Sequence, residues 1–513
     1  MNINQRIKTT AGRSSAPAAV AFTIFCWCFT VGVFADQGAV NGAHLPTDAK
    51  ATCTADVANW FPNHEITANG WVTPADGLKP IFADFQNNTR CDFYRWGAQM
   101  FLWLTSGAGT KHVFNTPPVF YDISVAEDGK RHFLSETGPM KLAVRKSKTD
   151  EEIELGQAGG GDVLLSQNQS LVYYGLHANN VYALYTTGRK NNDSSLPDHF
   201  PSTSDEIDSV NTYAVEQGYP LTDTEAMALE LKTSWADAAT VRDRSDYVLT
   251  QAIVPVFDRA AKDPTTGKQQ WTITGNQPKT LALVGMHVVG TVNGHPEMVW
   301  ATFEHVDNVP DATYQYTNMD GDPATWPYDA SGTWNFLPSN ATEPTSIAAN
   351  AQVSTYTGSG AECVRKDSQD DNTECIVNVN GAEIAPIDVI RPNPWGDDQS
   401  DSSSVANNTD LVSINVSVLS QLQAGDIRSN YIQTGSIWTA KGQIPPGFPD
   451  TDPDYLRGST HLANSTMETF FQFHNKGENA FNPQNCFGCH GSTESDATGI
   501  SHIYDELQPL PKK

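Results

Sequence analysis

Basic residues are scarce in this chain of 513 residues. Its 32 Lys and Arg compare with 59 Asp and Glu, which gives a formal net charge of −27 at pH 7. Because binding to nucleic-acid phosphates depends on Lys and Arg, this composition argues against a nucleic-acid partner. The charge favours solubility and would attract a redox partner protein with a basic docking face.

Long apolar runs are missing after the first 35 residues, so nothing later in the chain is expected to span a bilayer. Residues 1–35 have the pattern of a secretory signal peptide: three basic residues, an apolar core from Ala18 to Phe34 and a cleavage site after Ala35. An uncleaved membrane anchor is the alternative. Cleavage before Asp36 predicts a periplasmic or secreted bacterial protein that is not an integral membrane protein.

Cysteine is scarce as well: the chain has eight, and two of them lie within the predicted signal peptide. Two more belong to a motif near the C-terminus. The other four are expected to form disulfides, because exported proteins meet an oxidising compartment; they are Cys53, Cys91, Cys363 and Cys375. Pairing near neighbours predicts Cys53–Cys91 and Cys363–Cys375, although four cysteines allow three pairings.

Motifs of common enzymes are absent. The chain has no G-x-S-x-G, which disfavours a serine hydrolase. The glycines at 159–161 lack the order of a phosphate-binding loop. The acidic stretch 367–374 lacks the spacing of an EF-hand and is expected to be a solvated loop.

One motif carries specific chemistry: Cys486-Phe487-Gly488-Cys489-His490. C-x-x-C-H is the attachment signature of c-type haem, in which two thiols add to haem vinyl groups and the histidine binds the iron. A zinc site would need two more ligands, and the chain has no second C-x-x-C. A redox dithiol is the other alternative. The motif predicts one covalently bound haem c, held by Cys486, Cys489 and His490.

The second axial ligand is less defined, because no methionine follows His490. His502 is preferred, since the intervening chain is long enough to pass round the haem edge. Met467 and His474 are the next candidates, as they share one face of a helix predicted over 459–474. More distant candidates are His287 and Met298. The predicted metal ligands are therefore His490 and His502.

The rest of the chain is rich in β patterns. The dense apolar run 96–104 predicts a buried helix. Alternating β-branched and aromatic residues predict strands over 118–124, 140–145, 170–187, 229–235, 247–257 and 431–438. Asn179-Asn180 is expected to be a hairpin turn, and 411–422 a strand that leads into a helix.

The clearest hairpin is predicted over 280–304, where Asn293-Gly294 separates two apolar runs and favours a type I′ turn. A two-residue turn would place His287 opposite Trp300, with Glu304 on the same side of the sheet. A proline beside the turn weakens this register.

We therefore expect a mainly β (α+β) fold. A large β-rich body would span 36–445, with two subdomains if the loop-rich stretch around 310–362 separates them. A small α-helical c-type haem segment would occupy 446–513. This segment is too short to enclose a haem alone, so it is expected to pack against the body.

Several stretches resemble exported bacterial proteins of the cytochrome c family, which have a large β-rich body and a single C-terminal C-x-x-C-H motif. The resembling stretches are 96–104, 166–169, 172–174, 286–289, 299–308, 462–469, 485–490 and 500–504. They extend over most of the mature chain, which implies that body and haem segment form one functional unit. The resemblance assigns firm roles only to Cys486, Cys489 and His490.

Three functions are compatible with these features. The preferred function is that of a monohaem cytochrome, which transfers single electrons and has both axial positions filled. The first alternative is a peroxidase- or oxygenase-like haem oxidoreductase with an open iron site, whose substrate pocket lies in the β-rich body. His287, Glu304 or His305 would then be acid–base groups. The second alternative is a binding protein with an aromatic-lined cleft far from the haem.

Overall fold

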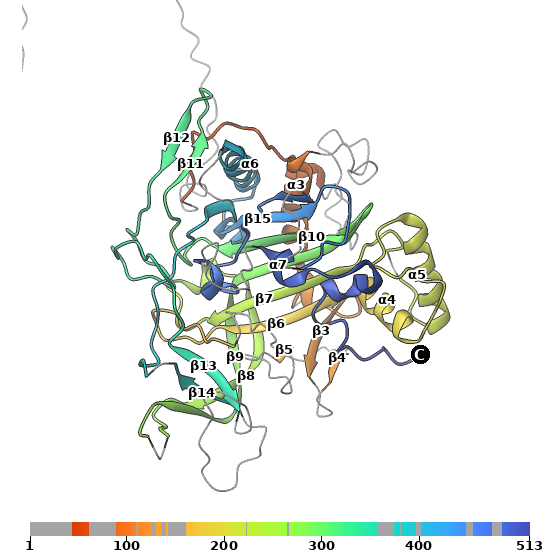
Figure 1. Ribbon diagram of the computed structural model, residues 1–513, viewed down its shortest axis with the longest axis horizontal. Coiled ribbons are helices and arrows are strands. Elements are labelled where there is room, and N and C mark those ends of the chain that lie inside the picture. Colours follow the sequence, from red (N-terminus) through yellow and green to blue (C-terminus); the bar gives the residue numbers. More distant parts are fainter. Residues whose placement is uncertain are drawn as a thin grey trace, which may run out of the picture. The chain divides into compact units, whose positions relative to one another are not determined.

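A large, mainly antiparallel sheet forms the centre of the fold (Figure 1). The computed structural model describes residues 44–60, 89–108, 111–125, 130–134, 140–141, 161–221, 223–263, 266–355, 374–379, 381–396, 402–447, 455–473 and 485–513. All of them belong to one compact unit, Gln37–Lys513. Among the described strands, 12 join the main sheet, which confirms the predicted β-rich body.

Five long strands are neighbours in this sheet: β15 (Tyr431–Thr439), β10 (His295–His305), β9 (Gln270–Val292), β7 (Leu229–Asp237) and β6 (Tyr173–Asn179). Each adjacent pair among them is antiparallel. Strand β16 (Leu456–Gly458) pairs with β15. The sheet therefore contains residues from both sides of the boundary predicted at 446.

The other elements surround these strands. The sheet also contains β3 (Phe120–Val125), β4 (Arg131–Leu134), β5 (Met140–Lys141), β8 (Leu249–Asp258), β13 (Ala351–Thr355) and β14 (Glu374–Asn378), and two small sheets are formed by β1 (Gly107–Ala108) with β2 (Lys111–His112) and by β11 (Tyr314–Thr317) with β12 (Pro323–Trp326). The described α-helices are α2 (Val57–Trp60), α3 (Arg90–Leu104), α4 (Asn180–Lys190), α5 (Ser204–Gln217), α6 (Ser402–Leu419) and α7 (Cys486–His490).

The two faces of the sheet carry different layers, because side chains alternate along each strand. Val288 of β9 and Phe303 of β10 belong to a core shared with α3 and α6. Phe101 of α3 stacks on Phe303 there, with ring centroids 4.4 Å apart. On the opposite face, Val289 and Trp300 pack in a second core with α4, α5 and residues of 485–513. Figure 1 shows α7 in front of this face.

The buried helix predicted over 96–104 is confirmed as part of α3. Two predicted strand segments are wrong, because their residues form helices. They are the second half of 170–187, which lies in α4, and the first part of 411–422, which lies in α6. After β6, the side chain of Asn179 accepts a hydrogen bond from the backbone N–H of Tyr182 and caps α4, so Asn179-Asn180 is no hairpin turn. The stretch 411–422 lies mostly in α6, which begins at Ser402.

The predicted hairpin of β9 and β10 is present, but its register is different. A register shift lies between His295 and Val299. A proline in this interval lacks the N–H that a regular ladder needs, and the extra residues form a bulge. His287 therefore faces Thr302, and Trp300 lies two cross-strand pairs further along, opposite Val289.

Residues 459–473 do not form the predicted helix. They consist of turns and the short 3₁₀ helix η7 (Thr469–Phe471). Their side chains are held by several partners on the sheet, and these tertiary contacts replace the helical pattern that the apolar spacing suggested. His474 lies outside the described residues.

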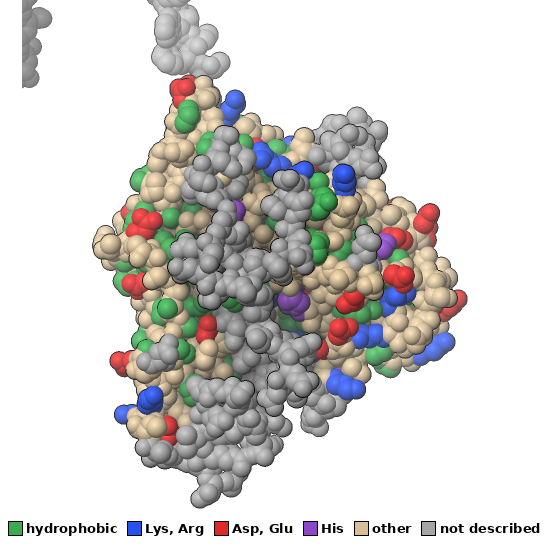
Figure 2. Space-filling view, in the orientation of Figure 1, with side chains coloured by type: hydrophobic (Ala, Val, Ile, Leu, Met, Phe, Trp, Pro, Cys, Tyr) green, Lys and Arg blue, Asp and Glu red, His purple; other side chains and the backbone are tan. Residues whose placement is uncertain are grey.

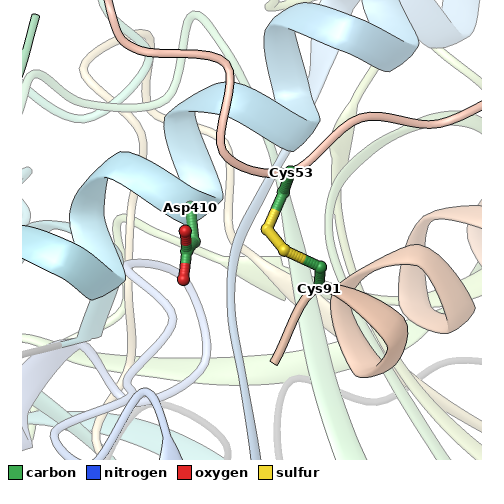
Figure 3. Close-up of side chains that lie close together, drawn as sticks. All are labelled: Cys53, Cys91 and Asp410. Atoms are coloured by element: carbon green, nitrogen blue, oxygen red, sulfur yellow. A yellow bond between two sulfur atoms is a disulfide. The ribbon is translucent and has the colours of Figure 1, made fainter. Parts of the chain in front are cut away.

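The disulfide predicted between Cys53 and Cys91 is confirmed (Figure 3). It joins the extended N-terminal segment to the start of α3. Asp410 of α6 lies beside it and forms an ion pair with Arg90 at 2.7 Å. Cys375 is also disulfide-bonded. Its predicted partner Cys363 lies outside the described residues, so that pairing stays a prediction.

Two further observations concern the described helices and the charged side chains on the surface. No helix in the described part of the chain is both long and apolar enough to span a membrane. Figure 2 shows acidic and basic side chains interspersed over α4 and α5.

Candidate functional site

Three rows of cross-strand neighbours on β7, β9 and β10 form the floor of the candidate site. Successive rows are two residues apart along each strand, which is about 7 Å. The rows are Ser234–Gly285–Glu304, Lys232–His287–Thr302 and Glu230–Val289–Trp300. Each row is contacted or approached by C-terminal segments of the chain, and we call these nine residues the floor.

The segment 459–473 lies against the first row because Gly285 has no side chain. A Cβ atom at Gly285 would come within 2.6 Å of Ser234 Oγ and 2.7 Å of Thr466 Oγ1. Those two hydroxyls share a hydrogen bond of 2.7 Å. Tyr174 Oη donates to the backbone oxygen of Thr466 at 2.9 Å. The glycine thus permits the close approach that these hydrogen bonds require.

Glu304 anchors the same segment. Its Oε1 accepts a hydrogen bond of 2.8 Å from the backbone N–H of Ser465, and its Oε2 accepts one from the Ser465 hydroxyl. Arg391 forms an ion pair with Glu304 at 3.1 Å and is itself paired with Asp311. These contacts occupy the buried carboxylate, so Glu304 is a structural group and does not line the pocket described below.

The third row contacts the C-terminal segment 485–502. The ring centroid of Trp300 lies 4.3 Å from that of His490 and 5.9 Å from that of Phe487. Ser501 Oγ donates to Glu230 Oε2 at 2.6 Å. The two C-terminal segments therefore contact the floor at rows that are four residues apart along the strands.

The short helix α7 positions the C-x-x-C-H residues. Asn485 caps it, because its side-chain oxygen accepts a hydrogen bond of 3.2 Å from the backbone N–H of Gly488. Cys486, Cys489 and His490 then follow the i, i+3, i+4 spacing that places side chains on one face of a helical turn. The motif thus presents two sulfurs and an imidazole in the same direction.

A pocket lies between these two segments and above the floor. A space of about 80 Å³ within it is accessible to the centres of water-sized molecules, and the pocket is partly open to solvent. Its lining is mainly apolar in area but contains several ionisable groups. The lining residues are Glu230, Leu231, Lys232, His287, Val289, Trp300, Leu462, Ala463, Met467, Glu468, Phe471, Asn485, Cys486, Cys489, His490 and His502.

His490 is oriented by the backbone. Its Nδ1 lies 2.9 Å from the carbonyl oxygen of Ile500, which makes Nδ1 the protonated nitrogen and leaves Nε2 as the acceptor. Burial lowers the pKa of His490 well below its usual value, so the ring is neutral. A neutral imidazole whose other nitrogen bonds to a carbonyl is the usual arrangement of a metal-binding histidine.

His502 lies on the same side of the pocket as His490. The two rings stack with centroids 3.9 Å apart and an interplanar angle of 17°. His502 Nε2 lies 3.0 Å from the backbone oxygen of Cys489. This arrangement differs from the sequence-based expectation that His502 passes round a haem to its far side, because stacked neighbouring rings cannot approach one iron from opposite faces.

The two motif thiols are not oxidised to a disulfide. Burial raises the pKa of Cys489 to about 12 and raises that of Cys486 as well. In the absence of a bound group both are therefore protonated thiols. Within the described ranges, the only three Cys, His, Asp or Glu side chains close enough to share an ion are Cys53, Cys91 and Asp410, and two of these form a disulfide.

Met467 lies on the other segment, beyond the Gly285 row. Its side chain is 1% exposed and lines the pocket. It packs in a small core with Tyr174 and Phe470. His474, the other candidate from this segment, cannot be located because it lies outside the described residues.

The pocket lining contains three charged residues that sequence patterns did not single out, Glu230, Lys232 and Glu468. His287 Nε2 and Glu468 Oε1 are 3.1 Å apart. Burial would raise the pKa of Glu468, but the charge and hydrogen bond of His287 outweigh burial and lower it. Burial raises the pKa of Glu230, although the hydrogen bond from Ser501 opposes the rise. Lys232 is the cross-strand partner of His287.

His305, the third acid–base candidate from the sequence, is remote from the pocket lining. It is buried and stacks on Tyr247 with ring centroids 3.7 Å apart. Its Nδ1 accepts from the backbone N–H of Asp307 at 3.1 Å, and Nε2 lies 3.2 Å from the carbonyl oxygen of Asp246. Both nitrogens are engaged within the core, so His305 has a packing role.

The alternation of Glu230 and Lys232 on β7 was a signal that sequence reasoning could have used. Residues i and i+2 of a strand face the same way. The sequence did not reveal that β7 neighbours β9 or that the C-terminal segments cover this face.

No protein-family model, no curated protein and no solved structure matches this chain.

Proposed function

We propose that this protein is an exported c-type haem protein that transfers single electrons. Cys486 and Cys489 would hold one haem c by thioether bonds, and His490 would bind its iron. A bound haem would supply a site that gains and loses one electron reversibly. A redox partner with a basic face would be drawn to the acidic chain.

One observation carries this proposal: the three motif side chains open into a single, mainly apolar pocket. Both cysteines line this pocket, where their sulfurs could add to vinyl groups, and the Ile500 carbonyl leaves His490 Nε2 available for iron. Trp300 lies against the His490 ring and restricts its movement. An apolar environment and exclusion of water are what tune a haem for electron transfer.

For the second axial ligand we favour Met467 over His502. Met467 belongs to the segment across the pocket, whereas His502 stacks on His490. His287 is also on the pocket lining, but Glu468 engages its Nε2. A thioether ligand has no such competing hydrogen bond, because sulfur is only a weak acceptor.

The test is to express the chain with a c-type haem maturation system and to measure its mass and absorption spectrum. The mature chain should gain the mass of one haem, and the double variant Cys486→Ala/Cys489→Ala should lose the covalent attachment. Haem that remained covalently bound in this variant would overturn the proposal. His490→Ala should keep the thioether bonds but lose the low-spin spectrum.

A haem oxidoreductase with an open iron position is the second candidate, and the charged pocket lining favours it. Electron transfer alone does not require His287, Glu468 and Lys232 beside the cofactor. Carbon monoxide separates the two functions. A reduced protein that ignores carbon monoxide has both axial positions filled and supports electron transfer, whereas ready binding supports the oxidoreductase.

A further inference from the structure

Most polar groups of the pocket have partners within the protein. Asn485 caps α7, and Glu230 accepts a hydrogen bond from Ser501. Glu468 accepts from His287 and from the backbone N–H of Asn464, the latter at 2.9 Å. Both carboxylates of the pocket lining, Glu230 and Glu468, thus have hydrogen-bond partners within the protein.

Lys232 is the exception. Within the described residues, its ammonium group forms no ion pair and no hydrogen bond. The group nevertheless lines a pocket whose walls are largely apolar. Lys232 is half-buried, and a negative partner would offset the hydration that an ammonium group loses beside apolar surface.

The charge of Lys232 acts on the pocket. Burial raises the pKa of the Cys489 thiol, and the positive charge of Lys232 opposes that rise. The same charge acts on Glu468 and His490, which belong to the two opposite segments. Lys232 lines the pocket together with residues of both segments, so it lies beside the space between them.

Lys232 and His287 are direct cross-strand partners. The Cβ atoms of such partners are about 4.5–5.5 Å apart, so both side chains can contact one small group. Glu468 holds the imidazole in place through His287 Nε2. The result is a pair of nitrogen-bearing side chains on the floor, directed into the pocket.

From this arrangement we infer that Lys232 and His287 together bind an anionic oxygen group inside the pocket. The inference rests on the proposed function, because the pocket is taken to contain a haem. Two sources supply this chemistry: a carboxylate of the haem itself, or a free small oxyanion bound beside it. In either case Lys232 provides the charge and His287 a second polar contact.

The experiment compares haem-loaded protein with Lys232→Met, Lys232→Arg and His287→Gln. Lys268→Met is the matched control, since it removes the same charge at an exposed position outside the pocket lining. Each protein is checked by mass for one covalent haem. It is then titrated with nitrite by absorption, and its midpoint potential is measured.

A free oxyanion predicts saturable nitrite binding that weakens about tenfold in Lys232→Met and persists in Lys232→Arg and Lys268→Met. A haem carboxylate predicts no nitrite response but a lower midpoint potential in Lys232→Met than in Lys232→Arg, since loss of a nearby positive charge favours oxidised iron. In both cases His287→Gln should change the same readout in the same direction, by less.

Identical binding and potential in Lys232→Met, Lys232→Arg and wild type would overturn the inference while the proposed function stands. Absence of covalent haem from all five proteins would overturn both.

Discussion

Three side chains of the candidate site differ in role because of their immediate contacts. His490 belongs to the motif and His502 follows it in the chain, and a backbone carbonyl, that of Ile500, holds Nδ1 of His490. His502 stacks on it and bonds to the chain through Nε2. Met467 is buried on the opposite segment and lines the pocket.

These positions predict different effects of substitution on the haem spectrum. Met467→Leu should remove a low-spin, methionine-ligated signal and allow carbon monoxide to bind the reduced protein. His502→Ala should leave the ligation unchanged, because the ring lies beside His490. Absorption and EPR spectra of both variants measure this. A loss of the low-spin signal in His502→Ala, with Met467→Leu unaffected, would show that the ranking is reversed.

His305 makes a separate prediction about acid stability. Burial lowers its pKa from 6.5 to about 3. Between these values the unfolded chain binds a proton and the native protein does not, so the free energy of unfolding falls as pH falls. The contribution is about 1.4 kcal/mol per pH unit. Urea unfolding from pH 7 to pH 4 should show a shallower decline for His305→Gln, which keeps polar atoms but cannot be protonated. Equal slopes would contradict this role.

Two glycines of the sheet allow the segment 459–473 to pack closely on the strands beneath it. Gly285 of β9 lies under Thr466, and Gly435 of β15 lies under Ser459 and Leu462. At both positions a Cβ atom would meet another atom at 2.4–2.7 Å. The segment 459–473 has little regular structure of its own, so its path is set by these two gaps in the sheet surface and by its hydrogen bonds to the first row of the floor.

Gly285→Ala should therefore destabilise the protein by about 1–3 kcal/mol, as overpacking does in other cores. The segment that carries Met467 and Glu468 must move away from the sheet, so the haem spectrum should change as well. Gly107→Ala is the control, because no atom lies within 4 Å of a Cβ atom there. Chemical unfolding measures the first effect and absorption the second. A neutral Gly285→Ala would mean that the segment is not held by this contact.

The two faces of the sheet carry different features, because the disulfide lies on one and the pocket on the other. The face toward α3 and α6 carries a large aromatic and aliphatic core and the Cys53–Cys91 disulfide. The face toward the C-terminal segments carries the pocket. The strands lie between the two faces, and Val288 and Val289 of β9 point into different cores.

The disulfide should thus affect global stability without changing the pocket. The bond closes a loop with a sequence separation of 38 residues. Replacing both cysteines with alanine should lower the free energy of unfolding by about 2–4 kcal/mol. The absorption spectrum and midpoint potential of bound haem should remain those of the wild type. A shifted potential in the double variant would contradict the separation of the two faces.

Local patterns were sufficient for features that depend on neighbours in the chain. The apolar run 96–104 predicted a helix, and alternation predicted β7, β8 and β15. Pairing of near neighbours among the four remaining cysteines predicted the Cys53–Cys91 disulfide. The spacing of Cys486, Cys489 and His490 marked a possible attachment site for the same reason. Each of these signals arises within a few residues or from composition.

Features that depend on contacts between distant segments were misread. The periodic apolar residues of 459–473 suggested a helix, but their partners are spread over β6, β7 and β10 and hold the chain in turns. The bulge before Val299 moved His287 from Trp300 to Thr302. Composition and spacing therefore specified the motif and the strands, whereas the pocket, with Lys232, His287 and Glu468 beside it, exists only because tertiary packing brings remote segments onto one face of the sheet.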